Sequence, residues 1–337
     1  MKKYNVAVVG ATGMVGRKFL QVLEERKLPV NNYYLFASAR SAGKKVSFLG
    51  KDYTIEELTE TCFAGKDIDI ALFSAGGGTS KKFAPIAAQA GALVIDNSSA
   101  WRMDKNVPLV VPEVNPQDIK WHSGIIANPN CSTIQAAVAL KPLYDKYGIV
   151  RVVYSTYQAA SGAGMGGYRD LENGINGDPP QKFPYPIFGN CIPQIDVFDE
   201  DGYTKEELKM VFETRKILGD DKLRVTATTV RVPVFHGHSE SINVELEKEY
   251  DLAELKQALA DFPGIVVCDE VVTGEGSGVY PMPLTVAGKD EVYVGRIRRD
   301  RSVESGVNLW VVADNVRKGA ATNAVQIAQT WIAMQEK

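Results

Sequence analysis

The 337-residue sequence predicts an α/β protein in which a doubly wound domain with a parallel sheet is joined to an α+β domain with a mixed sheet. Before Cys131, short apolar runs alternate with helical patterns, as in repeated strand–helix–strand units. After Lys141, the expected strands are longer and alternate between apolar and polar residues, which is typical of antiparallel or mixed sheets. With 45% hydrophobic residues, the chain can bury two sizeable cores.

The first part reads as buried strands separated by amphipathic helices. Residues 5–9 form a short apolar run that ends at a glycine, and residues 15–26 then repeat apolar side chains at helical spacing. The same alternation of strand and helix patterns recurs along the chain up to Cys131. Strands are expected at residues 5–9, 33–37, 68–73, 93–95 and 125–127, and helices at residues 15–26 and 81–90.

The second part is richer in β-structure. Residues 173–193 are dense in glycine, asparagine and proline and predict a long ordered loop, and residues 320–334 predict a strong final helix. The other elements expected here are strands at residues 151–157, 224–232, 241–246, 291–297 and 308–313, and helices at residues 204–218 and 252–260.

Composition excludes several classes of protein. A net charge of −3 and dispersed basic residues argue against a nucleic-acid surface, and the densest basic cluster, residues 296–301, reads as a solvated strand end. The four cysteines lie far apart without zinc spacing, so we expect a reducing compartment and no metal. The apolar stretch after Met1 is too short for a signal peptide, and no run is long enough to span a membrane. The sequence therefore predicts a cytoplasmic enzyme or binding protein.

A glycine-rich turn follows the first strand and opens the first helix. In Gly10-Ala-Thr-Gly13-Met-Val-Gly16, the first glycine allows a tight turn, the second lets the backbone approach phosphate, and the third permits close helix packing. The spacing is a variant of the dinucleotide fingerprint of Rossmann-type domains, and an ordinary strand-to-helix turn is the alternative.

The end of the second strand favours NADP over NAD. An NAD enzyme typically places Asp or Glu there, whereas this chain has Ser38, Arg40 and Ser41, which suit a 2′-phosphate. A surface loop that happens to be basic is the alternative, and use of both cofactors stays open.

Cys131 stands at the expected start of a helix, in Asn128-Pro-Asn-Cys-Ser-Thr133. A helix N-terminus offers free N–H groups and a positive dipole end, which favour a thiolate over a thiol. A thiolate attacks carbonyl carbon, so a covalent acyl intermediate is plausible here. Together with a nucleotide loop, this is the minimum needed to oxidise or reduce an acyl group through a thioester.

Few other residues can move a proton or bind an anion. Of three histidines, His122 reads as a surface residue, while the spacing of His236 and His238 does not separate one from the other. Arg102 follows a strand at the sheet edge where ligands bind, although a surface ion pair is equally plausible. Gln158 precedes a glycine-rich stretch, residues 161–167, which reads either as a loop over substrate or as an irregular turn.

Taken together, the motifs GATGMVG, SARSAG, DNSSAWRM, NPNCST, TYQAASGAG and RVPVFHGHSE resemble those of aspartate-semialdehyde dehydrogenases, in the same order and over nearly the whole chain. The compact loop at residues 173–193 is similar to the shorter branch of that family. The resemblance implies a dinucleotide-binding domain of residues 1–131 with 316–337, and a catalytic and dimerisation domain of residues 132–315. It also implies a homodimer or a dimer of dimers.

The likeness assigns catalytic residues one by one. Cys131 resembles the nucleophile that accepts the acyl group, Gln158 the residue that orients it, and His238 the acid/base, which leaves His236 structural. The reaction implied is the reversible, NADPH-dependent reduction of L-aspartyl 4-phosphate to L-aspartate 4-semialdehyde, with release of phosphate. This reaction serves lysine, methionine and threonine biosynthesis, including the diaminopimelate route.

Binding residues follow in the same way. Arg231 resembles the partner of the substrate carboxylate and Glu213 that of its amino group, although Glu213 and Lys216 read by themselves as a solvated i,i+3 pair. Arg102 and Lys216 match the phosphate-binding pair, and Asn130 and Ser161 complete the substrate site. The implied NADP(H) site comprises Gly10, Thr12, Gly13, Met14, Val15, Ser38, Arg40, Ser41, Ser74, Gly162 and Asn323.

Three other functions are alternatives to this one. N-acetyl-γ-glutamyl-phosphate reductase uses the same thioester chemistry, and Glu213 argues against it because a free amino group needs a carboxylate neighbour. A glyceraldehyde-3-phosphate-type dehydrogenase is disfavoured by the missing acidic residue near Ser38. A non-catalytic NADP-binding sensor would not need Cys131 or His238.

Overall fold

The chain passes between two units twice, after Pro129 and after Gly319. The computed structural model describes residues 2–336. One unit comprises Met1–Pro129 and Ala320–Lys337, and is called here the first unit; the second unit is Asn130–Gly319. These crossings lie two and four residues from the domain limits expected from the sequence. Each unit is described by itself below.

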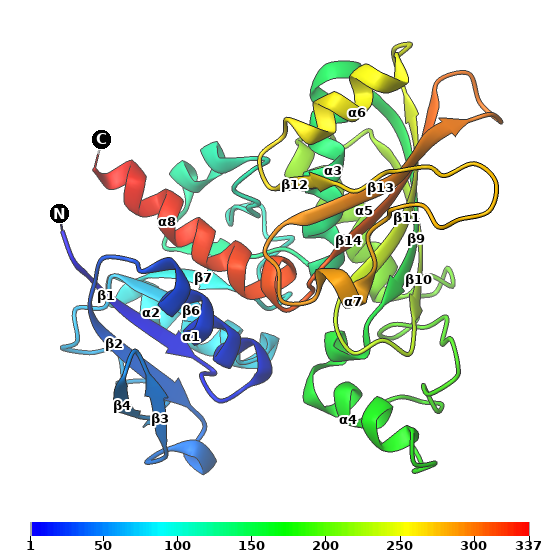
Figure 1. Cartoon of the computed structure of the whole chain (residues 1–337). Helices are drawn as coiled ribbons and strands as arrows, with labels where there is room; N and C mark the ends of the chain where they lie inside the picture. The colour runs from blue at the N-terminus through cyan, green and yellow to red at the C-terminus, as the bar shows by residue number, and fades with distance from the viewer. Residues whose placement is uncertain (1, 337) are drawn as a thin grey trace. The chain divides into compact units, whose positions relative to one another are not determined.

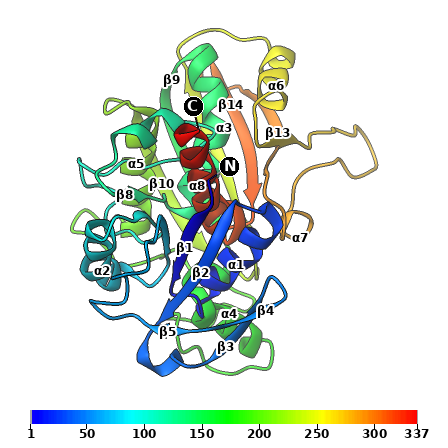
Figure 2. The ribbon, with the colours of Figure 1, turned by 90° about the vertical axis from the view of Figure 1, so that its left-hand side faces the viewer.

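The first unit is built on a six-stranded parallel sheet (Figures 1 and 2). Its strands follow the order β5-β2-β1-β6-β7-β8, so the sequence order reverses beside β1. Ligands of doubly wound sheets bind at such a reversal, beyond the carboxyl ends of the strands. The strands are β1 (Tyr4–Val9), β2 (Val30–Ala37), β5 (Glu56–Glu57), β6 (Ile70–Phe73), β7 (Leu93–Asp96) and β8 (Ile125–Ala127).

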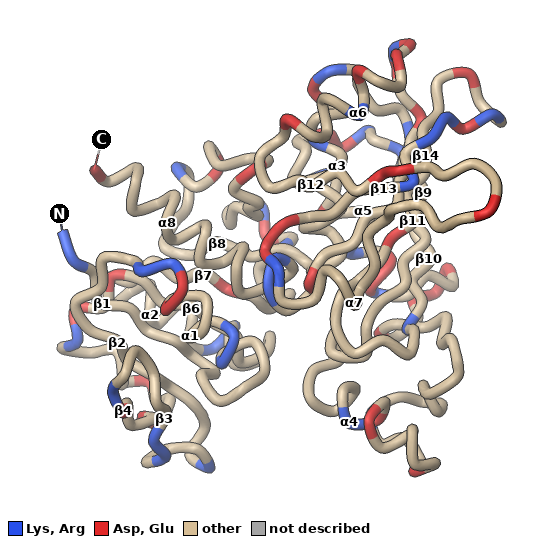
Figure 3. Tube along the Cα trace, in the orientation of Figure 1, with Lys and Arg blue, Asp and Glu red and all other residues tan. Residues whose placement is uncertain are grey.

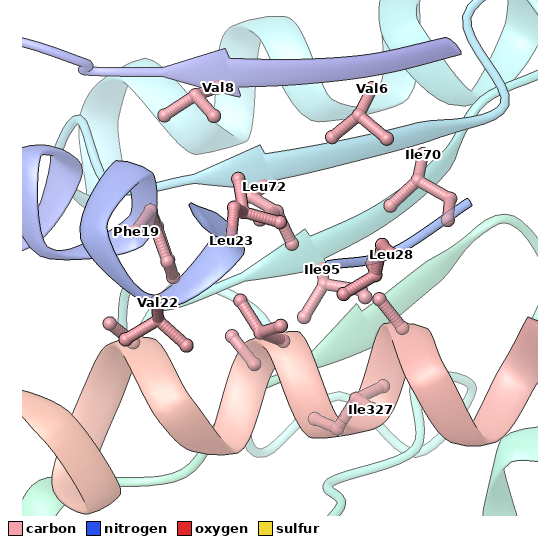
Figure 4. Packing of buried hydrophobic residues seen from close by; sticks show 14 of the residues in the cluster. Val6, Val8, Phe19, Val22, Leu23, Leu28, Ile70, Leu72, Ile95 and Ile327 are labelled. Atoms are coloured by element: carbon pink, nitrogen blue, oxygen red, sulfur yellow. The ribbon is translucent and has the colours of Figure 1, made fainter. Parts of the chain in front are cut away.

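Three helices cover this sheet: α1 (Met14–Arg26), α2 (Gly77–Gln89) and α8 (Asn323–Gln335). Figure 4 shows Val22 of α1 beside α8 and Ile327 of α8 below Ile95 of β7, all within one buried cluster. Burying a side chain of this kind stabilises a fold by about 1.5–3 kcal/mol. The last helix of the chain is therefore part of the same core as the first strand.

The second unit contains a six-stranded mixed sheet of order β10-β9-β11-β14-β13-β12. Its outer pairs β10/β9 and β12/β13 are parallel, and its inner pairs are antiparallel. Helix α3 (Cys131–Tyr147) packs across the middle strands, α5 (Lys205–Leu218) against β10, and α6 (Leu252–Ala260) against β12 and β13. The strands are β9 (Ile149–Gln158), β10 (Arg224–Arg231), β11 (His238–Leu246), β12 (Ile265–Val267), β13 (Val292–Asp300) and β14 (Gly306–Ala313).

The fold class expected from the sequence is confirmed, and one local prediction is wrong. Residues 161–167 form no irregular loop: a 3-10 turn (Ala160–Ala163) leads into helix α4 (Gly164–Gly174). Glycine disfavours a helix interior by about 1 kcal/mol relative to alanine. Close packing overrides that preference, because a Cβ on Gly167 would lie 2.5 Å from the carbonyl oxygen of Ala160.

Several smaller elements were not anticipated. Helix α2 begins at Gly77, four residues before its expected start, and a π-helix (Arg317–Thr322) precedes α8. The hairpin of β3 (Lys45–Phe48) and β4 (Lys51–Thr54) and the short helix α7 (Pro283–Val286) were also missed. The π-helix has six residues and β3, β4 and α7 have four each, so their periodic pattern is weak.

The surface carries charge of both signs. Figure 3 shows lysine and arginine scattered among aspartate and glutamate in both units, and the arginines at 296, 298, 299 and 301 are largely exposed on β13 and just after it. The four cysteines are free thiols. Among the described helices, none combines the length and apolar character needed to cross a membrane. Within residues 2–336, no cluster of three or more His, Cys, Asp or Glu side chains could hold a metal.

Candidate functional site

The glycine turn after β1 is held by two close backbone contacts. Gly10 has a positive φ of 86°, and a Cβ there would lie 2.3 Å from the carbonyl oxygen of Ser74. A Cβ on Gly16 would lie 2.0 Å from the carbonyl oxygen of Gly10. Only glycine fits at either position, and the turn therefore brings the start of α1 against the end of β1.

A cavity of about 530 Å³ opens beside this turn, at the carboxyl ends of the strands. Of the residues expected to bind cofactor, Gly10, Thr12, Gly13, Ser38 and Ser74 line it. Its position at the reversal of strand order and its size suit part of a dinucleotide.

The other expected cofactor residues belong to this unit, except Gly162, which is part of the second unit. Met14 and Val15 begin α1, and Ser41 ends a 3-10 turn and lies 3.5 Å from the hydroxyl of Thr12. Arg40 is exposed in that turn. Asn323 is fully buried and donates hydrogen bonds to the carbonyl of Val110 (3.0 Å) and the side chain of Asn128 (2.7 Å).

Arg102 is largely buried in the first unit. Its Nε donates to the carbonyl of Asn128 and its Nη2 to the carbonyl of Asn97, both at 3.0 Å. These contacts hold the guanidinium to backbone that follows β7 and β8.

In the second unit, Cys131 is the first residue of the 17-residue helix α3. The side chain of Asn130 caps this helix by accepting hydrogen bonds from the N–H groups of Ser132 (2.9 Å) and Thr133 (3.3 Å). The cap and the helix dipole favour negative charge at the first turn. Gly319 packs directly against the cysteine, because a Cβ there would lie 2.8 Å from the Cβ of Cys131.

A buried carboxylate that the sequence analysis overlooked joins two predicted site residues. Glu206, on α5, accepts hydrogen bonds from Asn130 Nδ2 (2.9 Å) and Gln158 Nε2 (3.1 Å). Its other oxygen lies 3.1 Å from the ammonium of Lys209, which also pairs with Asp196 at 3.0 Å. Burial alone would raise the pKa of Glu206, but Lys209 and the two amides lower it to about 2.

His238 begins β11 and is fully buried. Its Nδ1 accepts a hydrogen bond of 2.9 Å from the N–H of Ala159, so the neutral ring carries its proton on Nε2. That Nε2 makes no hydrogen bond to any residue from 2 to 336. Burial, with the charge of Arg231, lowers the pKa of His238 to about 3. The ring is therefore a neutral donor with an uncommitted N–H.

Arg231 ends β10 and is 4% exposed. Its Nη1 donates to the carbonyl of Ala159 at 2.6 Å, and desolvation lowers its pKa while the charges of Glu206 and Cys131 oppose that shift. A Cβ on Gly162 would lie 2.6 Å from this Nη1 and 3.1 Å from Nε2 of His238. The absence of a side chain at Gly162 thus leaves room in front of both donors.

The remaining predicted residues are placed as follows. Glu213 is buried on α5 and accepts a hydrogen bond of 2.6 Å from the backbone N–H of Asn130, while Lys216 lies half-buried in the last turn of that helix. Ser161 is buried and its hydroxyl accepts a hydrogen bond of 3.0 Å from the side chain of Asn315. Shared neighbours link the predicted residues of this unit: Glu206 joins Asn130 to Gln158, and Ala159 joins His238 to Arg231. Gly162 lies against both of the latter side chains, and the charge of Cys131 acts on Arg231.

The two other histidines lie outside this cluster of contacts. The ring of His236 packs against that of Tyr168, with 5.5 Å between centroids, and His122 accepts a hydrogen bond from the N–H of Gly124. The signal for Glu206 and Lys209 was present in the sequence, since they repeat the i,i+3 spacing of Glu213 and Lys216 on the same helix. Spacing alone does not tell which pair faces the site.

Two family descriptions match the chain: "Semialdehyde dehydrogenase, NAD binding domain" over residues 5–122 and "Semialdehyde dehydrogenase, dimerisation domain" over residues 140–318. The chain is similar to aspartate-semialdehyde dehydrogenase of Aquifex aeolicus (strain VF5), with 60% identity over 98% of each chain. It resembles the structure of aspartate semialdehyde dehydrogenase II from Vibrio cholerae complexed with ASA, with 49% identity, a TM-score of 0.94 and coverage of 99% of each chain. It also resembles the Candida albicans enzyme with NADP, with 26% identity, a TM-score of 0.77 and coverage of 98% of each chain.

Proposed function

The chain belongs to the aspartate-semialdehyde dehydrogenase family and is an oxidoreductase, and we propose that it reduces L-aspartyl 4-phosphate to L-aspartate 4-semialdehyde through a thioester on Cys131. The reaction is reversible, releases phosphate and belongs to the biosynthesis of lysine, methionine and threonine. The observation that carries the proposal is that one unit holds a helix-terminal cysteine, a neutral His238 with a free Nε2–H, and a buried Arg231 whose charge acts on His238 and is acted on by Cys131.

The covalent step uses the first turn of α3. The thiolate of Cys131 attacks the acyl carbon, the carbon–sulfur bond forms, and phosphate leaves with the electrons of the carbon–oxygen bond. The capped helix terminus and the charge of Arg231 favour the anionic sulfur. Gln158, fixed by Glu206, orients the acyl oxygen.

The second step is reduction of the thioester. NADPH, when bound, supplies the hydride that reduces the thioester carbonyl. The Nε2–H of His238 faces the room left by Gly162 and donates a hydrogen bond to the oxyanion of the resulting thiohemiacetal. The carbon–sulfur bond then breaks, which releases the aldehyde and regenerates the thiolate. The family resemblance gives His238 the acid/base role, and with Nδ1 occupied by the N–H of Ala159 the ring acts as a hydrogen-bond donor through Nε2.

Substrate recognition requires partners for the carboxylate and for the amino group of the amino acid. The Nη1 of Arg231 is held by the carbonyl of Ala159, and the other N–H donors of the planar guanidinium give it an edge that suits a bidentate carboxylate. We propose a carboxylate of α5 for the amino group. Glu213 follows from the family resemblance, and Glu206 is favoured by its contacts with Gln158 and Asn130.

The phosphate group needs cationic partners. Arg102 and Lys216 are proposed for this role together with Asn130 and Ser161 in the substrate site, while Lys209 is a second cation on α5 beside Glu206. A phosphate is a strong acceptor, and both arginine and lysine bind it well.

NADP is proposed over NAD. The first unit has no Asp or Glu at the end of β2, where Ser38, Arg40 and Ser41 stand instead. A relative with 26% identity has been solved with NADP. The free thiols and this cofactor support a cytoplasmic location.

We propose a homodimer formed by the second unit, which matches a dimerisation domain. The sheet has an apolar region away from its helices, where the rings of Tyr157 and Trp310 lie 5.5 Å apart and Tyr157 is 40% exposed. A cavity of about 350 Å³ adjoins Trp310 and is lined by Tyr280 and Met282. Such a patch on a dimerisation domain is what a second copy would cover. A dimer of dimers remains part of the proposal.

The decisive experiment is phosphate-dependent reduction of NADP by the purified protein with L-aspartate semialdehyde, run beside N-acetylglutamate semialdehyde. We expect activity with the former alone, abolished in Cys131→Ala. Activity with the acetylated aldehyde would assign the chain to the acetylglutamyl reaction. Tight NADPH binding with no activity on either aldehyde would instead support a sensor.

A further inference from the structure

An aromatic ring covers one face of the buried guanidinium of Arg231. The ring of Phe183, from the segment after α4, lies 5.7 Å from Cζ of Arg231. A cation within about 6 Å of an aromatic face is attracted to it, and more strongly where water is excluded. Arg231 is 4% exposed, so this contact is largely desolvated. The ring leaves the in-plane N–H groups of the guanidinium available.

The backbone that carries Phe183 is held by a single carboxylate. Asp170 of α4 accepts three hydrogen bonds from consecutive N–H groups, those of Gln181 (2.9 Å), Lys182 (2.8 Å) and Phe183 (2.8 Å). Burial acts to raise the pKa of Asp170, but the three N–H donors lower it overall. The carboxylate therefore stays charged and keeps this segment in place at neutral pH.

Close packing fixes the position of the ring. A Cβ on Gly167 would lie 2.8 Å from Cζ of Phe183, and a Cβ on Gly166 would lie 3.3 Å from the side chain of Lys182. Phe183 also packs against the small cluster formed by Ala160, Leu171, Ile187 and Ile192. The glycines of α4 thus let the segment approach, and the cluster limits how the ring can turn.

Arg231 is consequently held from two directions. Its Nη1 donates to the carbonyl of Ala159, at the start of the turn before α4, and its face rests on Phe183, after α4. A planar guanidinium that is fixed at one nitrogen and on one face has a defined plane. A bidentate carboxylate contact requires such a plane.

We propose that Phe183, seated by Asp170, is a positioning residue that sets the plane of Arg231 for the substrate carboxylate. The inference rests on the proposed function, since it takes Arg231 to bind the carboxylate of aspartate semialdehyde. It goes beyond that function by assigning substrate affinity to a ring and an acid that need not touch the reacting atoms.

The test is Phe183→Leu, which removes the ring and keeps an apolar side chain. Loss of the ring is expected to raise KM for aspartate semialdehyde about 5- to 30-fold, the range that cation–π attraction at a desolvated site allows. We expect kcat to change less than about threefold and KM for NADP to stay constant, because the nucleophile and the nucleotide cavity are not altered. Tyr185→Leu, at an exposed aromatic residue of the same segment, is the matched control and should leave all constants unchanged.

A second variant tests whether the hydrogen bonds of Asp170 hold the backbone that carries the ring. Asp170→Asn keeps the shape but turns an NH2 group toward backbone donors, so amide hydrogen exchange at residues 181–183 should accelerate and KM for the semialdehyde should rise. An unchanged KM in Phe183→Leu, or equal rises for semialdehyde and NADP, would overturn the proposal. Failure of the proposed function is distinguished because it would show first in the wild-type protein, as absent activity with aspartate semialdehyde.

Discussion

The N–H of Ala159 donates a 2.9 Å hydrogen bond to Nδ1 of His238, and this contact decides which proton the histidine can offer. The ring is fully buried and its proton lies on Nε2. A second proton on Nδ1 would meet the N–H of Ala159 head-on. The fold therefore presents His238 as a neutral hydrogen-bond donor, whatever the bulk pH near neutrality.

His238→Gln tests the consequence for stability and catalysis. The folded pKa is lowered to about 3, below the ordinary value of 6.5, so the folded state binds fewer protons between these values and stability falls as pH drops through them. Between pH 7 and pH 5 the wild type should lose about 2 kcal/mol from this group. The variant should lack that loss in urea unfolding at the two pH values, and its kcat should fall about 100-fold or more. An equal pH dependence in both proteins would contradict the buried neutral ring.

Glu240 should behave as a neutral carboxylic acid. It lies two residues beyond His238 on β11 and is fully buried, and neither of its oxygens makes a hydrogen bond to a described residue. Burial raises its pKa well above the ordinary value of 4.5, although the neighbouring Ser132 hydroxyl favours the charged form. The free energy of unfolding is therefore highest below pH 4.5, where Glu240 is protonated in both the folded and the unfolded state. It falls as the pH rises through the folded pKa, because the unfolded state ionises more readily.

Glu240→Gln mimics the protonated acid and should therefore unfold at higher urea than the wild type at pH 8, with little change at pH 5. Activity should persist in this variant, since the amide fills the same volume. Glu240→Ala should be about 2–4 kcal/mol less stable than Glu240→Gln at both pH values, because it leaves a cavity and neither side chain titrates. If Glu240→Gln were less stable than the wild type at pH 8, we would conclude that Glu240 is charged at that pH and that a cationic or hydrogen-bonding partner stabilises it.

Gly319→Ala should displace the nucleophile. Its new methyl group would lie 2.8 Å from Cβ of Cys131, and a shift of the cysteine by about 1 Å can cost about 100-fold in rate. We expect kcat to fall by about that factor and alkylation of Cys131 by iodoacetamide to slow. Gly78→Ala is the control, because a Cβ at that helical position meets nothing within 4 Å. Full activity in Gly319→Ala would show that the π-helix of residues 317–322 shifts to make room for the methyl group and that Cys131 keeps its position.

Arg40→Ala addresses the choice of cofactor. The exposed guanidinium is proposed to pair with the 2′-phosphate, so its loss should raise KM for NADP about tenfold, in keeping with one charged hydrogen-bonding partner. KM for NAD should not change, since NAD has no 2′-phosphate. Parallel increases for both cofactors would indicate a role in folding of the turn after β2.

Glu206→Gln and Glu213→Gln separate two candidate partners of the substrate amino group. Glu206 contacts Gln158 and Asn130 through its side-chain hydrogen bonds, and its pKa of about 2 keeps it charged. We expect Glu206→Gln to raise KM for the semialdehyde about tenfold or more, with a smaller effect from Glu213→Gln. The reverse order would return the assignment to Glu213, as the family resemblance implied.

Much of the fold was accessible from periodicity. The strands at residues 5–9 and 125–127 and the helix at residues 15–26 are strong local patterns, and they appear in the structure within a residue or a few of the expected limits. The glycine-rich stretch after Ser161 was misread because glycine weakens any helical pattern. Only packing against Ala160 and Phe183 explains why glycines stand inside α4.

The sequence by itself determined the fold class, the glycine turn before α1 and the cysteine at the start of α3, because each depends on residues that are neighbours in the chain. The tertiary structure decided which proton His238 carries, that Glu206 meets Gln158, and that Phe183 rests on Arg231. These relations join residues 79, 48 and 48 positions apart, respectively. Local pattern carries no information on such contacts, since they arise from how strands and helices pack and from the burial that packing imposes.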